Sequence, residues 1–301
     1  MIESLEYIEK PLRLQSVGNT EVACFGTGEE NIDKVTVDSF GQEWLKFDEF
    51  SATEIKNAGD QYFDIITDSE LNKKSRVLDL GCGSGRWTKY MADKAGRIEA
   101  VDPSEAVFSA ASTYGNLKNV RFSQAGVDNI PFPDNSFDFI ISLGVLHHIT
   151  DTQMALNSVM KKLKPGGNIL LYLYYALDNR GFLYKLIFNL STIFRKIVSN
   201  LSHKAKHFVC DLIAVLVYFP LVTLSRILKL FGGKLYLKIP LAYYRDKSWN
   251  IIRNDALDRF GTPLEQRFSK IQITEMLKKS GATHIRFSDN EPYWHVVATK
   301  K

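Results

Sequence analysis

The sequence predicts an α/β protein with a doubly wound, seven-stranded sheet, mostly parallel with the last strand antiparallel, plus a helical lid insertion. From residue 76 onward, nearly continuous apolar runs alternate with helical patterns, as expected for a parallel sheet covered on both faces. The first run, 77–80, leads into three alternating glycines and a helical stretch, which is the pattern of a nucleotide-binding turn. Near the end of the chain, a tight return joins two strand patterns, so these strands can pair as a hairpin.

The sequence pattern predicts the bounds of the strands and of the helices around them. Lys164-Pro-Gly-Gly167 is expected to be a turn that ends the fourth crossover helix, because Pro and Gly stop a helix. The expected helices around the sheet cover 86–94, 103–114 and 270–280. The expected strands are 76–80, 98–102, 120–123, 137–142, 168–174, 284–288 and 295–300.

The alternation divides the chain into three parts. Residues 1–70 are expected to be a helical or irregular extension, whereas 71–175 and 263–301 together form the sheet domain. Between them, 176–262 interrupt the alternation and are expected to form a basic, helical lid.

Two helices are expected within this insertion. Apolar residues recur at helical spacing over 183–198, and a more apolar helix runs over 208–231 with a kink at Pro220. The most apolar stretch, 212–225, is shorter than the roughly 20 residues that a membrane-spanning helix needs. A buried helix pair or an interfacial segment is therefore favoured over a span.

Charge is distributed unevenly along the chain. The net charge is +4, but residues 180–247 contain twelve Lys or Arg and only two acids, Asp211 and Asp246. This block therefore carries +10, which leaves −6 for the remainder of the chain. A basic amphipathic block favours peripheral contact with an anionic membrane. The alternative is a two-helix cap whose apolar faces pack on each other or across a homodimer.

The cysteines and histidines indicate a reducing compartment and no metal site. Cys24, Cys82 and Cys210 are far apart and odd in number, so they form no disulfide framework. The acidic N-terminus lacks the apolar core of a signal peptide, which favours a cytoplasmic protein. His203 and His207 have metal-ligand spacing, but no third ligand accompanies them.

Acids and glycines gather where the carboxyl ends of the first two strands would meet. Asp79 precedes the turn 81–85, and Asp102 ends the second strand. Ligands bind at the carboxyl edge of such sheets, and an acid there suits ribose hydroxyls. A dinucleotide-binding protein would share these features, but the spacing here is GxGxG rather than GxGxxG, and an acid precedes the first glycine.

The chain resembles class I S-adenosylmethionine-dependent methyltransferases of the seven-strand type. The motifs that carry the resemblance are VLDLGCGSGRW (77–87), AVDPSEAVFSAA (100–111), NIPFPDNSFDFIISLGVLHHI (129–149) and LKPGG (163–167). FGQEW (40–44) and DRFGTP (258–263) also resemble a bacterial subgroup often associated with surface-polysaccharide or secondary-metabolite pathways.

The resemblance implies S-adenosylmethionine as the cofactor and assigns its contacts by position. Its ammonium group would lie near Asp79, its ribose hydroxyls would be held by Asp102, and Ser142 would pass beside its sulfonium. The residues implied under the methionine part and along the adenine are Gly81, Cys82, Gly83, Gly85, Pro103 and Ser104.

One contact of the family is missing from this sequence. Gly126 stands where members commonly have an acid that meets the adenine amino group. Either Asp128 substitutes for that acid, or backbone groups near Val127 read the adenine.

The acceptor side offers histidines and tyrosines. If the acceptor is an alcohol, a general base helps to remove its proton, and His147 and His148 follow the fourth strand on the substrate side. Either histidine could instead only pack or cap the next helix. Tyr172 and Tyr174, which share a face by alternation, are the alternative acceptor-side groups.

An aromatic segment precedes the sheet domain. Trp44, Phe47 and Phe50 recur at helical spacing, so this segment either packs on the main domain or closes over the ligand.

These observations lead to one principal function and two alternatives. The chain is expected to transfer a methyl group to a small-molecule or lipid-linked acceptor, by O-methylation in a biosynthetic pathway, with the insertion as substrate lid. The alternatives are a non-catalytic binding protein with the same fold and an RNA methyltransferase. Few basic residues lie outside 180–247, so no nucleic-acid partner is expected. The expected location is the cytoplasm, with membrane association left open.

Overall fold

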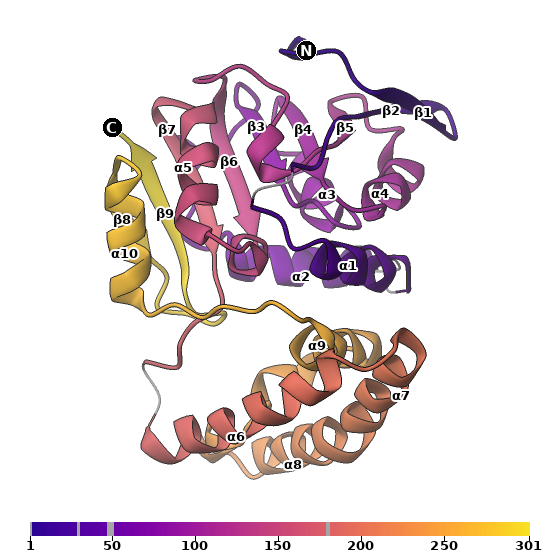
Figure 1. The fold of residues 1–301 in the computed structure, drawn as a ribbon. Helices are drawn as coiled ribbons and strands as arrows, with labels where there is room; N and C mark the ends of the chain where they lie inside the picture. The colour runs from indigo at the N-terminus through magenta and orange to yellow at the C-terminus, as the bar shows by residue number, and fades with distance from the viewer. Residues whose placement is uncertain (1, 29–30, 47–50, 179–180) are drawn as a thin grey trace. The chain divides into compact units, whose positions relative to one another are not determined.

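The computed structural model describes residues 2–28, 31–46, 51–178 and 181–301 (Figure 1). The chain divides into two compact units. The sheet unit comprises Met1–Asp178 and Leu264–Lys301, and the helical unit comprises Asn179–Pro263.

The sheet unit is built on a mixed sheet with the strand order β1-β2-β5-β4-β3-β6-β7-β9-β8. The sheet has nine strands rather than the seven expected from the sequence. The strands from β2 to β7 pair in parallel along this order, whereas β9 runs antiparallel to both of its neighbours. Their bounds are β1 Arg13–Val17, β2 Thr20–Cys24, β3 Arg76–Leu80, β4 Arg97–Asp102, β5 Val120–Gln124, β6 Phe137–Leu143, β7 Leu163–Tyr172, β8 Ala282–Phe287 and β9 His295–Lys300.

The two additional strands form an N-terminal hairpin beside β5. β1 pairs antiparallel with β2, Gly18 turns between them with a φ of 57°, and β2 continues the sheet parallel to β5. β1 buries none of its residues, so its sequence RLQSV carries no apolar pattern that marks a strand. Its pairing partner fixes it instead of its own sequence.

Helices cover both faces of the sheet and enclose two apolar cores (Figure 1). Side chains alternate across each strand, so neighbouring residues such as Val77 and Leu78 belong to different cores. α5 and α10 contribute to one core, and α3 and α4 to the other. The helix bounds in this unit are α1 Lys34–Lys46, α2 Ala52–Tyr62, α3 Arg86–Ala92, α4 Ala106–Tyr114, α5 Thr152–Lys162 and α10 Lys270–Lys279.

The Lys164–Gly167 segment is not the turn that the sequence analysis expected. α5 ends at Lys162 and β7 begins at the next residue, Leu163. Phe137 pairs with Leu163 but Phe139 pairs with Asn168, so the segment bulges out within β7. Gly166 takes a φ of 78° in this bulge, a conformation open to glycine at little cost.

The helical unit contains one long helix that the sequence analysis expected to be shorter. α7 His203–Ile213, a π-helical turn Ala214–Tyr218 and α8 Phe219–Leu230 run without a break over 28 residues. Pro220 lacks an N–H and its ring crowds the carbonyl four residues earlier, which the wider π-helical turn before it accommodates. The other elements of the unit are α6 Phe182–Ser199, short 3-10 turns at Leu235–Lys238 and Ala242–Asp246, and α9 Trp249–Gly261.

Polar contacts hold the long helix against α9. Tyr218 and Tyr244 both donate to the carboxylate of Asp255 on α9, the former at 2.6 Å. Arg253 on α9 makes a bidentate ion pair with Asp211 at 2.9 and 2.8 Å. Burial and the Asp255 charge hold the pKa of both tyrosines well above the usual value, so they remain donors.

We expect Tyr218→Phe to destabilise the chain by about 1.5–3 kcal/mol, the range for a hydrogen bond to a charged group. The substitution removes the donor to Asp255 but keeps the buried ring. Chemical denaturation monitored by circular dichroism measures the change. Tyr243→Phe, at a less buried neighbouring ring, is the control, and equal stability of Tyr218→Phe and wild type would contradict the assignment.

Candidate active site

The glycine turn after β3 is held by the end of β4. Gly81, Gly83 and Gly85 have φ values of 74°, 52° and 81°. Residues that carry a Cβ rarely adopt this backbone conformation. The N–H of Gly81 donates to the Val101 carbonyl at 2.8 Å, and the N–H of Gly83 donates to Oδ2 of Asp102 at 2.8 Å. The turn is therefore shaped by its neighbour strand before any ligand arrives.

Asp102 joins the glycine turn to the start of the next helix. Its Oδ1 accepts from the Ser104 N–H at 2.9 Å and from the Ser104 hydroxyl at 2.6 Å. Burial raises the pKa of Asp102, while the bonds from Ser104 and Gly83 oppose that rise. Since each carboxylate oxygen has two lone-pair positions, Oδ2 retains one for a further donor. This arrangement offers one position for a ligand hydroxyl rather than two.

Asp79 lies beneath the turn with 1% of its surface exposed. Its carboxylate accepts from the Thr88 hydroxyl at 2.5 Å. Burial raises the pKa of Asp79 to about 7, opposed by Thr88 and reinforced by the charge of Asp102. Burial likewise raises the pKa of the neighbouring Cys82 thiol well above its usual value, so this thiol is not an activated nucleophile.

The segment after β6 packs directly onto the glycine turn. A Cβ added to Gly81 would lie 2.3 Å from Cγ2 of Val145, so a larger residue there would displace this segment. Two buried polar atoms near this packing, the Ser142 hydroxyl at the end of β6 and Nε2 of His147 in the segment after it, have no hydrogen-bond partner among the described residues. Leaving such groups unsatisfied costs about 1–3 kcal/mol each, so they are candidates to bind a ligand.

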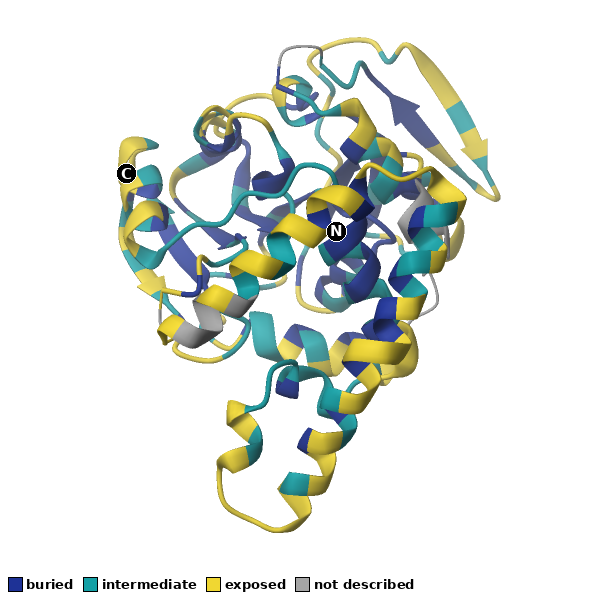
Figure 2. Cartoon of the chain, turned by 60° about the horizontal axis from the view of Figure 1, so that its bottom comes forward, coloured by how far each residue is buried: buried dark blue, intermediate teal, exposed yellow. Residues whose placement is uncertain are grey.

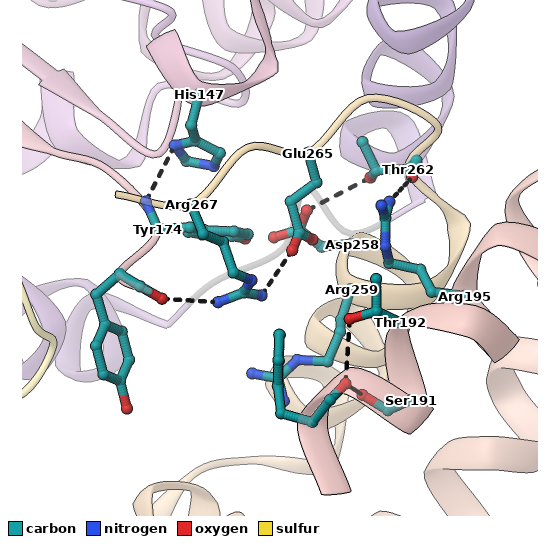
Figure 3. A network of polar contacts seen from close by, with 12 residues as sticks. His147, Tyr174, Ser191, Thr192, Arg195, Asp258, Arg259, Thr262, Glu265 and Arg267 are labelled. Atoms are coloured by element: carbon teal, nitrogen blue, oxygen red, sulfur yellow. Dashed lines mark hydrogen bonds and ion pairs between the residues drawn. The ribbon is translucent and has the colours of Figure 1, made fainter. Parts of the chain in front are cut away.

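His147 points toward the backbone nitrogen of Tyr174 (Figure 3). Its Nδ1 accepts from the Tyr174 N–H at 3.4 Å, which assigns the proton of the neutral ring to Nε2. The ring stacks on Tyr174 with centroids 3.9 Å apart. Burial, with the nearby His148 and Arg267, holds the pKa of His147 well below 6.5. Nε2 therefore presents an N–H rather than a basic lone pair.

His148 has the opposite tautomer. Its Nδ1 lies 2.7 Å from the Leu264 carbonyl, which can only accept, so Nδ1 carries the proton. In the neutral ring, Nε2 is then the basic nitrogen. Phe40 of α1 packs edge-on against this ring at 4.6 Å between centroids. Of the two histidines proposed from sequence, His148 has the geometry of a base.

Tyr172 lies at the end of β7, within an aromatic cluster. Its ring contacts Tyr174 at 6.0 Å and Tyr62 of α2 at 5.2 Å between centroids. Tyr172 pairs with His295 of β9 in the sheet. The cluster places this tyrosine at the same sheet edge as the segment after β6.

Gly126, the position of the adenine-binding acid in the family, packs closely against the backbone of Thr27. A Cβ added to Gly126 would lie 1.9 Å from the Thr27 carbonyl oxygen, so glycine is required there. Asp128 is exposed, and Val127 is partly buried in the short turn Val127–Asn129. On the facing loop, the Pro103 carbonyl accepts from the side chain of Gln124 at 3.3 Å.

The first helix, α1, also covers this edge of the sheet. A Cβ added to Gly41 of α1 would lie 3.4 Å from Cβ of Ser104, and Phe40 contacts His148. α1 therefore contacts both the loop after β4 and the segment after β6. Of the aromatic residues that indicated this helix, Phe47 and Phe50 lie outside the described residues. Trp44 lies in α1, and its side chain is not among those described.

The segment that contains most of this site is similar to known methyltransferases. Residues 78–171 match the family described as "Methyltransferase domain". The chain is 34% identical over 115 residues to the uncharacterized methyltransferase YcgJ of Bacillus subtilis, covering 37% of this chain and 46% of YcgJ. It is 33% identical over 109 residues to the ubiquinone/menaquinone biosynthesis C-methyltransferase UbiE of Pasteurella multocida, covering 34% of this chain and 41% of UbiE.

The chain spans less than half the length of each of these two relatives. The crystal structure of YcgJ from B. subtilis superposes with a TM-score of 0.39 at 30% identity, over 45% of this chain and 58% of YcgJ. The matched segment contains the glycine turn, Asp102, Ser142 and both histidines of the site, but not α1 or the helical unit.

We expect Gly126→Ala to displace the segment around Thr27, because the new Cβ cannot coexist with the Thr27 carbonyl. Overpacking of this kind costs about 1–3 kcal/mol. Limited proteolysis should show faster cleavage near residues 25–28, and thermal denaturation should show a lower midpoint. Gly181→Ala, where an added Cβ meets no described atom within 4 Å, is the control. Unchanged proteolysis of Gly126→Ala would contradict the packing.

Proposed function

We propose that this chain, in which residues 78–171 form a class I S-adenosylmethionine-dependent methyltransferase domain, transfers a methyl group to a hydroxyl of a small-molecule or lipid-linked acceptor. The observation that carries the proposal is the glycine turn, which a hydrogen bond to Asp102 holds in place. Beside it lie two buried polar atoms without a partner among the described residues, the Ser142 hydroxyl and Nε2 of His147. The site of reaction is the carboxyl edge of the sheet, under α1.

The residues at this edge fit S-adenosylmethionine. The turn at 81–85 brings backbone close to a ligand, and Asp102 retains one acceptor position for a ribose hydroxyl. Asp79 would supply negative charge for an ammonium group once it loses its proton, and Ser142 would offer a hydroxyl that has no partner among the described residues. The carboxylate expected from the family at position 126 is absent, so adenine would be read by backbone groups or by Asp128.

The two histidines would divide the work on the acceptor. S-adenosylmethionine supplies an already electrophilic methyl group, so the protein mainly has to position the acceptor and manage its proton. His148 would accept that proton at Nε2, because Nδ1 is committed to the Leu264 carbonyl. His147 would donate from Nε2 and orient the acceptor oxygen. Tyr172 and Tyr174 would line the acceptor side.

The helical unit is proposed as the substrate lid. Its chain leaves after Asp178, beyond the carboxyl end of β7, and returns at Leu264, whose carbonyl binds His148. Both connections are therefore on the sheet unit's reactive edge. UbiE relatives are named for C-methylation in a biosynthetic pathway, which supports a biosynthetic role for this chain. A methyl-transfer assay that identifies the product distinguishes O-methylation from C-methylation. The proposed location is the cytoplasm.

We expect S-adenosylmethionine to bind with release of protons below pH 7. Below pH 7, the free site holds Asp79 largely protonated, since its pKa is about 7, and a bound ammonium group would lower that pKa. Affinity should therefore rise as pH increases toward 7 and level off above it. Calorimetry in buffers of different ionisation enthalpy measures both affinity and protons released. Asp79→Asn should remove the proton release, and no detectable binding by wild type would overturn the proposed function.

We expect His148→Asn to lower kcat by about 10²–10⁴-fold, the usual contribution of a general base. Asparagine can still donate to the Leu264 carbonyl, so the fold and the cofactor affinity should persist. The readout is transfer of a radiolabelled methyl group into a solvent-extracted small-molecule fraction. His147→Asn retains an acceptor for Tyr174 and should raise KM more than it lowers kcat. Equal kcat for His148→Asn and wild type would contradict the assignment of His148.

A further inference from the structure

The helical unit exposes an apolar stripe along α6. Phe182, Leu186, Leu190, Ile193 and Ile197 recur every three or four residues, which places them on one side of the helix. Four of them have about 60% or more of their surface exposed: 81% for Phe182, 60% for Leu190, 63% for Ile193 and 61% for Ile197. Such a continuous exposed stripe exceeds the isolated apolar residues normal on a soluble surface.

The opposite side of α6 buries polar residues. Arg195 is 9% exposed and donates to the Thr262 and Pro263 carbonyls at 2.8 and 3.4 Å. Ser199 is 7% exposed. Val198, at 1% exposed, is buried with them, so the buried side is mixed. The unusual feature is the exposed apolar stripe, since a surface helix in water turns its apolar side to the core.

The long helix and the turn after it repeat this exposure and add charge. Leu230 and Phe231 are 86% and 82% exposed, and Leu235 and Leu237 follow at 58% and 44% (Figure 2 shows exposure along the chain). Among these residues lie three lysines with exposed side chains, Lys229, Lys234 and Lys238. The end of α8 thus interleaves large apolar side chains with cations.

We propose that the helical unit docks on the surface of an anionic lipid bilayer through the α6 stripe (Phe182, Leu186, Leu190, Ile193 and Ile197) and the α8 end (229–238). Apolar side chains enter the boundary between headgroups and acyl chains, and lysines pair with anionic headgroups. This inference goes beyond the proposed methyl transfer and does not depend on it.

The charge of the unit favours a bilayer over a second copy of the chain. Residues 180–247 carry +10, whereas the rest of the chain carries −6. A symmetric dimer through these surfaces would bring two strongly positive blocks together, which costs energy. An anionic bilayer attracts the same block and repels the remainder of the chain.

The polar side of the long helix favours surface docking over a span. Residues 203–230 are long and apolar enough to cross a membrane by length and composition. However, Tyr218 bonds to Asp255 and Asp211 bonds to Arg253, so one side of the helix is committed to the charged helix α9. Lipid on all sides of the helix would require these ion pairs and hydrogen bonds to break.

The experiment is flotation of the full chain with vesicles of phosphatidylcholine alone or of phosphatidylcholine with phosphatidylglycerol. We expect binding to the anionic vesicles at low salt, weakened by salt, and release by alkaline carbonate. Lys234→Gln and Lys238→Gln should each lower partition about fivefold. Ile193→Ser with Ile197→Ser, and separately Leu230→Ser with Phe231→Ser, should lower it about tenfold or more.

Ile271→Ser, which removes an equally exposed apolar residue from α10 of the sheet unit, is the matched control and should bind like wild type. Circular dichroism verifies that each variant is folded. The inference is overturned by failure of wild type to bind anionic vesicles at low salt or by equal binding to neutral vesicles. Resistance to carbonate would show a span instead, and a dimer abolished by the same substitutions would assign the surface to a second copy.

Discussion

The geometry of the site depends on the carboxylate of Asp102. This one group accepts from the N–H of Gly83 in the turn after β3 and from the backbone and hydroxyl of Ser104 before α4. It thereby fixes the two loops between which a nucleotide-like ligand binds in this class of sheet. Burial makes the charge costly, and the bonds from Gly83 and Ser104 offset that cost. The loops are consequently positioned before the ligand is bound, which reduces the ordering that binding requires.

The central strands could be predicted from sequence because a strand buried on both faces is a nearly continuous run of apolar residues. β3 occupies the expected residues 76–80, and the antiparallel position of β9 followed from the tight return before it. β1 could not be predicted because all of its side chains lie at the surface and only its pairing with β2 defines it. The Lys164–Gly167 segment was wrongly predicted as a turn before the strand, because its Pro and Gly fit a bulge inside β7 equally well. The His203–Leu230 helix begins before the expected residue 208, because the stretch 203–207 is polar and lacks the apolar pattern that marks the rest of the helix.

The candidate site divides in the same way. Asp79, Asp102 and the glycines are close in sequence to strand ends, so local pattern locates them. The roles of His147 and His148 depend on which nitrogen meets the Tyr174 N–H or the Leu264 carbonyl, contacts that no local pattern encodes. The reason for glycine at 126 is a carbonyl about 100 residues earlier, at Thr27, and the covering contacts of Phe40 and Gly41 are equally remote. Sequence pattern finds what the fold class requires, and the structure is needed for the contacts that distant segments add.

The most direct test of the Asp102 clamp is a double-mutant cycle on the ribose. Calorimetry would compare S-adenosylhomocysteine with its 2′-deoxy and 3′-deoxy analogues, each against wild type and Asp102→Asn. The structure leaves one acceptor position on Oδ2, so removal of one of the two hydroxyls should weaken binding to wild type by about 1–3 kcal/mol. The same removal should matter little in Asp102→Asn, which would make the two losses non-additive. Equal losses in both proteins would contradict the clamp as the seat of the cofactor ribose.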